Sequence, residues 1–374
     1  MESTHNSPTA TLCLIGSFPP APSGQALVNE SFRQLAQAAG ANVITIDLAP
    51  PPGPATVRRR LSRLPKVLAG IRRLFSLLAR RRADAIYIGV AGGYGQLYDL
   101  TFVSLTRLSS VRLFIHHDSY AYLAKRRRLT ATLLRISGPS ATHIVLCEDM
   151  KQRLTDLYGR ALRIVVIANA TNTEPPTDPP RVRTKLRTIG FVSHISRSKG
   201  VLEFLDVVER ICVSQPGVRA LLAGPIEEPS LKQVIQGRLA RAPQIKYVGP
   251  VYGEAKSRFY AEIDAFVFPT RHANEADPRV INEALSHGVA VVALGRGCIR
   301  SVVAGGGGAV LAEGTDFVAD ATRLLLEWYE NPTLFSSISS AALANSARLK
   351  ADQGARLDAL IGELTSIAPA TCDS

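Results

Sequence analysis

The chain has 374 residues, of which 46% are apolar and 20% are charged, a balance that excludes wholesale disorder and collagen-like repetition. Lys and Arg number 44 against 31 Asp and Glu, for a net charge of +13, and residues 1–180 hold 22 of the basic residues against 11 acidic ones. This length favours two domains, and the cationic first half favours an anionic surface as its partner.

No segment has the features of a membrane anchor or an export signal. The N-terminus lacks a basic region, and its apolar stretch from Leu12 to Ile15 ends at Phe18-Pro19-Pro20, which is too short for a signal peptide. No apolar run reaches the roughly 18 residues that a membrane-spanning helix needs. We therefore expect a cytoplasmic protein that is soluble or peripheral at the inner face of the cell membrane.

Short apolar runs of the β type alternate with helical patterns along the whole chain. Their near-continuous apolar character is typical of parallel sheets that helices cover on both faces. The first series of predicted strands is Thr11–Ile15, Asn42–Asp47, Ala85–Ile88, Arg112–Ile115, Thr142–Leu146 and Arg163–Ile167. The second series is Thr188–Val192, Arg219–Ala223, Ile245–Val248, Ala265–Phe268 and Ala290–Ala293.

A proline-rich stretch from Thr171 to Arg183 separates the two series and has no periodic pattern, so it is predicted to link two domains. Both domains are predicted to be doubly wound α/β sheets that face each other, which would place ligands in the cleft between them. The segment from about Phe317 to Ile367 is predicted to be helical, with an interruption at Pro332, and to return to the first domain. The expected boundaries are 1–174, a linker at 175–183, 184–345, and a C-terminal helix and tail at 346–374.

The segment from Arg58 to Arg82 contains ten basic residues and no acidic one. Two interpretations remain open: an apolar stripe packs on its own sheet beneath solvated arginines, or the basic face lies against anionic lipid headgroups. Since a doubly wound domain needs such a stripe for its core, this helix is not expected to insert deeply into a membrane. Electrostatic docking to an anionic membrane surface is expected, and the basic run Lys125–Arg128 would contribute to it. Nucleic acid is not expected as a partner, because interleaved aromatic residues are missing. The stripe comprises Leu61, Leu64, Leu68, Ile71, Phe75 and Leu78.

Residues 266–297 contain the densest set of chemical groups. The predicted strand that ends at Phe268 leads into a polar loop, and Asp277 is predicted to cap a helix that has Pro278 as its first residue and ends before Gly288. The N-terminus of such a helix favours a phosphate group.

Two glutamates accompany this helix. Glu275 precedes it and Glu283 lies inside it, so one carboxylate can accept hydrogen bonds from a ribose and the other from a second sugar. Together with the phosphate-favouring helix end, they provide a counterpart for each part of a sugar nucleotide.

The pattern Glu275-x7-Glu283, followed by Ala284-Leu285 and His287-Gly288, resembles the donor-site signature of retaining glycosyltransferases of family 4, which have the GT-B fold. The segment Ile189–Val201 resembles the phosphate segment of that family. Two further segments resemble its next glycine turn and the element that lines the nucleotide base: Leu221–Pro225, which contains Gly224, and Tyr247–Val251. The resemblance covers roughly residues 11–345 and is closer in the second half.

The resemblance implies that Lys199 faces the pyrophosphate of the donor. His194 falls where the family usually has an arginine, and Arg197 could compensate for that change. A neutral imidazole is a weaker phosphate partner than a guanidinium group. In the first half, His117 matches a histidine that the family often places near the transferred sugar, with His116 as the alternative register. Gly24 lies in a loop that resembles the first glycine loop of the family.

The expected function is therefore that of a retaining hexosyltransferase of the family 4 type, which moves a sugar from a nucleotide sugar to a saccharide or lipid-linked acceptor in envelope polysaccharide biosynthesis. No metal or cofactor is expected, and the five cysteines contain no CxxC pair.

Two alternatives remain open: a non-catalytic relative that binds a nucleotide sugar or a membrane, and a nucleotide-sugar epimerase of the same fold. The first is motivated by His194 and by Pro278, which has no N–H to offer a donor. The expected catalytic residues are His117, Lys199 and Glu275, and the expected donor-binding residues are Gly24, His194, Arg197, Gly224, Val251 and Glu283.

Overall fold

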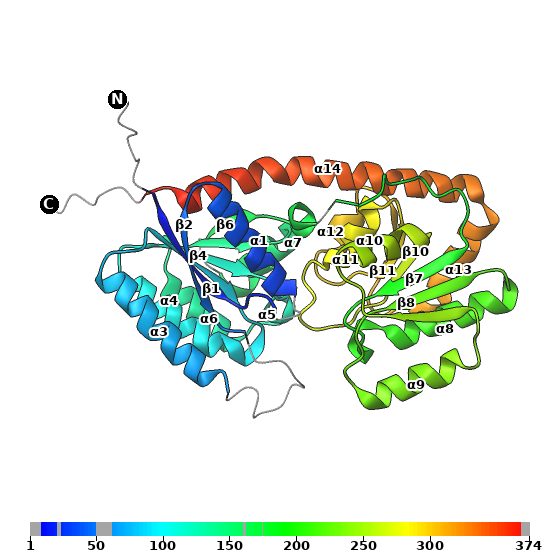
Figure 1. Ribbon diagram of the computed structural model, residues 1–374, viewed down its shortest axis with the longest axis horizontal. Helices are drawn as coiled ribbons and strands as arrows, with labels where there is room; N and C mark the ends of the chain where they lie inside the picture. Colours follow the sequence, from blue (N-terminus) through cyan, green and yellow to red (C-terminus); the bar gives the residue numbers. More distant parts are fainter. Residues whose placement is uncertain (1–8, 21–23, 50–61, 160–161, 174, 368–374) are drawn as a thin grey trace. The chain divides into compact units, whose positions relative to one another are not determined.

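The computed structural model describes residues 9–20, 24–49, 62–159, 162–173 and 175–367. The chain divides into two compact units, which Figure 1 colours along the sequence. Unit 1 is Met1–Ala168 together with Gln353–Ser374, and unit 2 is Asn169–Asp352. The proline-rich segment that was predicted to link two domains falls within unit 2.

Unit 1 is built on a six-stranded parallel sheet with the strand order β2-β1-β3-β4-β5-β6. All six strands begin at the residues where the apolar runs predict them. The strands are β1 Thr11–Gly16, β2 Asn42–Asp47, β3 Ala85–Val90, β4 Arg112–His117, β5 Thr142–Val145 and β6 Arg163–Val166. The helices with at least ten residues are α1 Gly24–Ala38, α3 Leu64–Ala79, α4 Gln96–Arg107, α6 Arg128–Ser137 and α7 Glu148–Tyr158, and the four-residue helix α5 is Ala121–Ala124.

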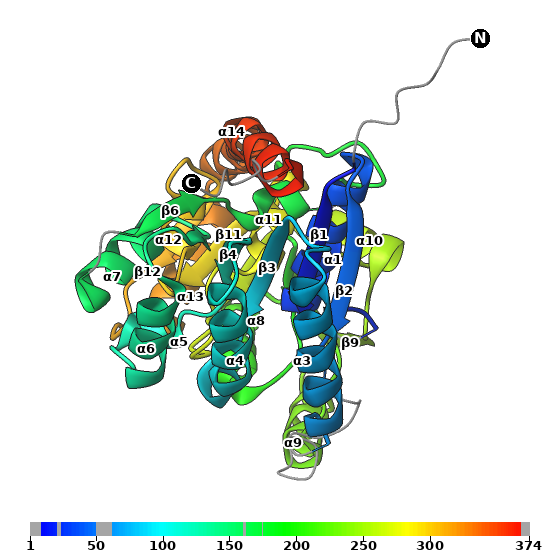
Figure 2. The ribbon, with the colours of Figure 1, turned by 90° about the vertical axis from the view of Figure 1, so that its left-hand side faces the viewer.

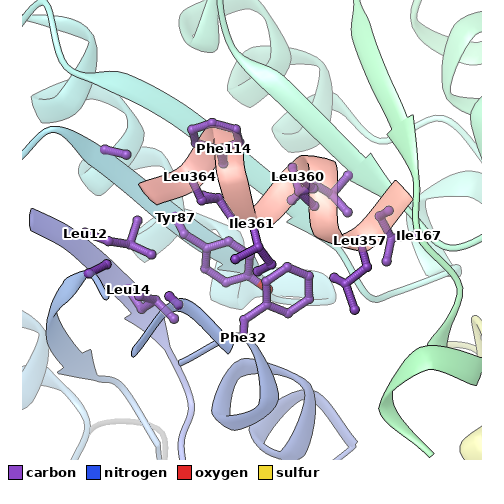
Figure 3. Packing of buried hydrophobic residues seen from close by; sticks show 14 of the residues in the cluster. Leu12, Leu14, Phe32, Tyr87, Phe114, Ile167, Leu357, Leu360, Ile361 and Leu364 are labelled. Atoms are coloured by element: carbon purple, nitrogen blue, oxygen red, sulfur yellow. The ribbon is translucent and has the colours of Figure 1, made fainter. Parts of the chain in front are cut away.

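The C-terminal helix α14 (Pro332–Thr365) begins in unit 2 and ends in the core of unit 1. Figure 2 shows its end on the face of the sheet opposite to α3, α4 and α6. Its last turns contribute Leu357, Leu360, Ile361 and Leu364 to a buried cluster with Leu12, Leu14, Phe32, Tyr87 and Phe114 (Figure 3). The predicted return of the C-terminal helix is therefore confirmed, and the return begins at Gln353.

The helix α3 does not pack as its apolar stripe predicts. Leu64, Leu68 and Phe75 are 41%, 57% and 62% exposed, while the buried face is formed by Val67, Gly70 and Leu74. The reason is close packing: a Cβ atom at Gly70 would lie 2.7 Å from a methyl group of Ile46, so the helix approaches β2 on its glycine side. The expectation that the stripe fills the core was wrong for these three residues, and Leu61 lies outside the described residues.

Unit 2 contains a second six-stranded parallel sheet, with the order β12-β11-β10-β7-β8-β9. The predicted α/β class with two doubly wound sheets is confirmed, and β12 is an addition that the apolar pattern did not indicate. The strands are β7 Thr188–Val192, β8 Arg219–Ala223, β9 Ile245–Gly249, β10 Ala265–Phe268, β11 Ala290–Leu294 and β12 Gly308–Leu311. The helices are α8 Val201–Ser214, α9 Pro229–Leu239, α10 Gly253–Glu262, α11 Arg279–Ser286, α12 Ile299–Val303 and α13 Phe317–Glu330.

The predicted interruption at Pro332 is also present, since α13 ends at Glu330 and α14 begins at Pro332. Although α14 has 34 residues, neither it nor any other helix in the described ranges is apolar enough over a sufficient length to cross a membrane.

Candidate functional site

The carboxyl ends of β7 and β10 bring Lys199 and Glu275 into contact. The Lys199 Nζ atom lies 2.5 Å from Glu275 Oε2, and the side chains are only 19% and 10% exposed. A glycine makes this approach possible: Gly200 has φ +85°, and a Cβ there would lie 2.5 Å from the carbonyl oxygen of Pro269, directly after β10. The close approach of the α8 start to the end of β10 thus places the lysine beside the glutamate.

Glu275 uses the same oxygen for a second bond. The buried hydroxyl of Thr270 donates to Glu275 Oε2 at 3.0 Å. Among the described residues, no hydrogen bond reaches the other oxygen, Oε1. The carboxylate is therefore held in one orientation by a cation and a hydroxyl and keeps an oxygen that can accept from a ligand.

Glu283 repeats this arrangement with different partners. Its Oε2 atom is 2.5 Å from Lys256 Nζ and accepts a hydrogen bond of 2.9 Å from Tyr260 Oη, and its side chain is 12% exposed. In the part of the chain that the structure describes, its Oε1 also accepts no hydrogen bond. The structure thus gives Glu283 a lysine of its own, Lys256 on α10, which was not among the expected site residues.

Further polar groups surround the pair of Lys199 and Glu275. His272 Nδ1 lies 3.1 Å from the hydroxyl of Ser198, and burial together with the charge of Lys199 lowers the pKa of this histidine. Thr270 and His272 were not among the predicted site residues. Their position directly after β10, where ligands of parallel sheets gather, is the signal that could have identified them; Lys256 has no such signal.

Asp277 does not cap α11 as predicted. The helix begins at Arg279 with Pro278 at the N-cap, and no side chain caps it. Asp277 is instead buried, where its two oxygens accept from the backbone N–H of Asn169 at 2.7 Å and the side-chain amide of Asn282 at 3.2 Å. Because Asn169 begins the 3-10 turn Asn169–Asn172, this hydrogen bond connects the loop before α11 to the start of unit 2.

Gly224 lies at the convergence of three strands. Its φ is +123°, and a Cβ at this position would lie 1.7 Å from the carbonyl oxygen of Ser193, so only glycine fits. Its N–H donates to the carbonyl of Gly249 at 2.8 Å, and its own carbonyl accepts from Tyr247 Oη at 2.8 Å. The turn therefore fixes the ends of β7, β8 and β9 relative to one another.

The two other candidate phosphate partners lie at the same strand ends but engage acidic residues. His194 Nε2 is 3.2 Å from Glu227, and Arg197 Nε is 3.4 Å from Glu228. All four side chains are between 39% and 60% exposed, and exposed pairs of this kind contribute little to stability. An incoming anion can therefore compete with these carboxylates for His194 and Arg197.

Within the described ranges, neither Gly24 nor Val251 takes part in a side-chain hydrogen bond, an ion pair or a ring contact. Gly24 is the exposed first residue of α1, and a Cβ there would meet nothing within 4 Å, so the close packing of a glycine loop is not required. Val251 is half-buried between β9 and α10.

His117 is fully buried at the end of β4. Its Nδ1 lies 3.0 Å from Tyr122 Oη and its Nε2 lies 3.0 Å from His143 Nδ1, so both ring nitrogens are engaged inside unit 1. Burial lowers its pKa well below the usual range, and the neighbouring imidazoles act in the same direction. A bond between His117 and a sugar would require one of these two hydrogen bonds to break. The alternative residue, His116, is 2.5 Å from Tyr87 Oη through Nδ1.

This histidine cluster predicts a loss of stability in acid. Burial lowers the pKa of His143 to about 4, whereas a histidine in an unfolded chain binds a proton below about 6.5. Between these values the unfolded state binds more protons, so the free energy of unfolding falls as the pH falls. We expect His143 to account for a loss of about 2 kcal/mol between pH 7 and pH 5, measured by urea denaturation followed by circular dichroism.

The variant His143→Gln should remove most of this pH-dependent loss. The unchanged protein, measured at the same two pH values, is the reference. An undiminished pH dependence in folded His143→Gln would contradict the prediction.

Across the described ranges, no three His, Cys, Asp or Glu side chains are grouped as a metal ion would require. The cationic side chains described here at the strand ends of unit 2 are those of Lys199 and Arg197, and each is paired with a glutamate.

A family model matches part of the chain. Residues 186–331 match the model described as Glycosyl transferases group 1. The D-inositol 3-phosphate glycosyltransferase of Streptosporangium roseum is 26% identical over 214 residues, which are 52% of this chain and 48% of that protein. The chain thus spans about half the length of this curated relative. The range of the family model, 186–331, falls within the unit that contains Lys199, Glu275 and Glu283.

Structural comparison covers nearly the whole chain. The sucrose-phosphate synthase of Thermosynechococcus elongatus superposes with a TM-score of 0.73 at 15% identity, covering 95% of this chain and 99% of that one. Alr3699/HepE of Anabaena, in a complex with UDP, superposes with a TM-score of 0.68 at 17% identity, covering 94% and 100%. At these identities the likeness shows the fold, which is that of GT-B glycosyltransferases.

Proposed function

We propose that the chain is a retaining hexosyltransferase of the family 4 type that moves a sugar from a nucleoside-diphosphate sugar to a hydroxyl of an acceptor. The observation that carries this proposal is the paired arrangement in unit 2. Glu275 and Glu283 are each held through Oε2 by a lysine and a hydroxyl, and each keeps Oε1 for a ligand. Two fixed carboxylates beside cations at strand ends match a ligand that combines polyols with a diphosphate. The match of residues 186–331 supports the same assignment.

Each residue then has a role. Glu283 accepts from the ribose hydroxyls of the nucleotide, and Glu275 accepts from hydroxyls of the transferred sugar. Lys199 binds the diphosphate, helped by His194 or Arg197 once the anion displaces their acidic neighbours. Gly224 and Val251 line the nucleotide, Gly24 also contributes to donor binding, and His117 acts as a catalytic residue near the transferred sugar.

The chemistry follows from where negative charge develops. As the bond between the sugar carbon and the diphosphate breaks, the leaving group gains charge, and a preorganised ammonium group such as that of Lys199 stabilises it. The acceptor oxygen bonds to the same face of the sugar carbon, so that the anomeric configuration is retained, and the hydroxyl proton passes to the departing diphosphate. The proposed reaction uses no metal and no cofactor, because the side-chain cations of unit 2 carry the positive charge.

The proposed acceptor is a saccharide or a lipid-linked saccharide in an envelope polysaccharide pathway, reached by a cytoplasmic protein that binds peripherally to an anionic membrane. The charge distribution supports this choice, since residues 1–180 carry 22 basic against 11 acidic side chains. The observation that favours a non-catalytic relative is the pairing of His194 with Glu227 at 3.2 Å, which occupies a position expected to bind phosphate.

The experiment that tests the proposal measures donor binding and turnover separately. Calorimetric titration with UDP, GDP and ADP and their glucose conjugates should reveal one preferred nucleotide. Glu283→Ala should weaken its affinity by about 10- to 100-fold, the cost of removing hydrogen bonds to a charged group. The matched control is Glu254→Ala, an exposed glutamate of the same helix that carries Lys256.

Unchanged nucleotide affinity in folded Glu283→Ala would contradict ribose recognition. Binding without hydrolysis or transfer of any sugar would favour the non-catalytic relative, and interconversion of the donor sugar without an acceptor would favour an epimerase.

A further inference from the structure

The helix α3 presents an apolar stripe to solvent. Leu64, Leu68 and Phe75 are separated by four and seven residues, which at 100° per residue places them within about 40° of one another around the helix. They are 41%, 57% and 62% exposed, and Ile71 between them is half-buried. The stripe extends over about 16 Å of helix.

Single exposed apolar residues are ordinary, but a second exposed apolar set lies at the start of the neighbouring helix. The segment that begins α4 exposes Tyr94 by 82% and Leu97 by 54%. The two helices are joined at this end, because the Arg63 guanidinium before α3 lies 5.7 Å from the ring centre of Tyr98 on α4. Figure 2 shows α3 and α4 on the same face of the sheet of unit 1.

The cations of α3 fall into two groups. Lys66 and Arg73 hold the helix to the sheet, since Lys66 is 3.1 Å from Asp47 and Arg73 donates to the carbonyl of Thr45 at 3.2 Å. Arg72 borders the stripe, and three more arginines follow the helix. No ion pair of the described ranges involves any of these four, which are Arg72, Arg80, Arg81 and Arg82.

We propose that α3 lies in the interface of an anionic bilayer, with Leu64, Leu68 and Phe75 among the upper acyl chains and the four unpaired arginines on the lipid phosphates. Charge complementarity selects this occupant: α3 contains no acidic residue, and a face with apolar side chains beside unpaired cations matches a surface that is apolar inside and anionic at its rim. This rests on the peripheral membrane binding of the proposed function and deepens it, because it names the helix and the side chains of unit 1 that enter the bilayer, none of which belongs to the donor site.

The first test is flotation of the full-length protein with vesicles of phosphatidylcholine alone or with 30 mol% phosphatidylglycerol. We expect binding to the anionic vesicles that weakens with salt. The triple variant Leu64→Ser/Leu68→Ser/Phe75→Ser should reduce the partition coefficient at least tenfold. The matched control is Val213→Ser on α8, which is 85% exposed and should leave it unchanged.

The second test separates insertion from electrostatic docking. The chain has a single tryptophan, Trp328, which is 3% exposed in unit 2. Phe75→Trp should therefore add an exposed fluorophore whose emission shifts to the blue on anionic vesicles and is quenched by brominated acyl chains. Flotation without the shift and quenching would overturn insertion.

Other outcomes also overturn the proposal. Equal binding to neutral vesicles would show that anionic lipid is not what the helix recognises. If the protein does not float with any vesicle, it does not bind a membrane through this helix. Concentration-dependent self-association that the triple variant abolishes, without vesicle binding, would identify a second copy of the chain as the occupant. None of these readouts depends on nucleotide binding, so failure here leaves the proposed sugar transfer to its own experiment.

Discussion

Lys199→Ala is expected to lower turnover by about two to three orders of magnitude, the cost of removing one preorganised charge from the site where negative charge develops. Its ammonium is held 2.5 Å from Glu275 and is only 19% exposed, so it has little freedom and meets little competition from water. The measurement is the initial rate of nucleoside-diphosphate release at saturating donor, with kcat and KM determined separately.

The design must separate lost chemistry from lost structure, because removing the lysine leaves the buried Glu275 without its cation. The double variant Lys199→Ala/Glu275→Gln relieves that charge and should recover thermal stability without recovering turnover. Lys232→Ala on α9 is the matched control, since that lysine is exposed. A loss of turnover below tenfold in a folded Lys199→Ala protein would show that Lys199 does not stabilise the leaving diphosphate.

Arg183→Ala is expected to reduce the free energy of unfolding of unit 2 by about 3–5 kcal/mol, as for a buried charged group removed from its partners. The residue is 3% exposed, and burial lowers its pKa to about 10. Its guanidinium donates to backbone carbonyls from three places in the chain, so its loss leaves buried acceptors unsatisfied. These acceptors are Arg181 at 2.8 Å, Tyr260 and His287 at 2.9 Å, and Ile263 at 3.3 Å.

Urea denaturation followed by the fluorescence of Trp328 reports on unit 2 directly, because that tryptophan is buried in α13. Arg241→Ala is the matched control: this exposed arginine donates to a single carbonyl, that of Gly237, at 3.1 Å. A difference of less than about 1 kcal/mol between the two variants would show that the carbonyls find other donors.

The fold follows from the sequence where burial dictates composition. Strands that helices cover on both faces must be apolar throughout, so the eleven predicted runs appear as strands. The twelfth strand, Gly308–Leu311, is half-buried at the edge of its sheet and follows a run of glycines, so its composition carries no such signal. Local composition likewise located the break at Pro332, since proline begins a helix more readily than it continues one.

The candidate site was only partly predictable. Two glutamates eight residues apart and Lys199 were identified from sequence, and the structure joins Lys199 to Glu275. Three other features depend on contacts between segments that are distant in the sequence. Lys256 holds Glu283, and Asp277 is buried against Asn169. Both ring nitrogens of His117 are engaged inside unit 1.

The sequence by itself determined the alternation of strands and helices, the cationic first half, and the acidic and basic residues available at the strand ends, because each depends on local composition. Only the tertiary structure decided which cation meets which carboxylate and which face of α3 is buried. The reason is physical: Gly70 and Gly200 allow close approach on one side only, and that approach, rather than the apolar pattern, sets which side chains face inward.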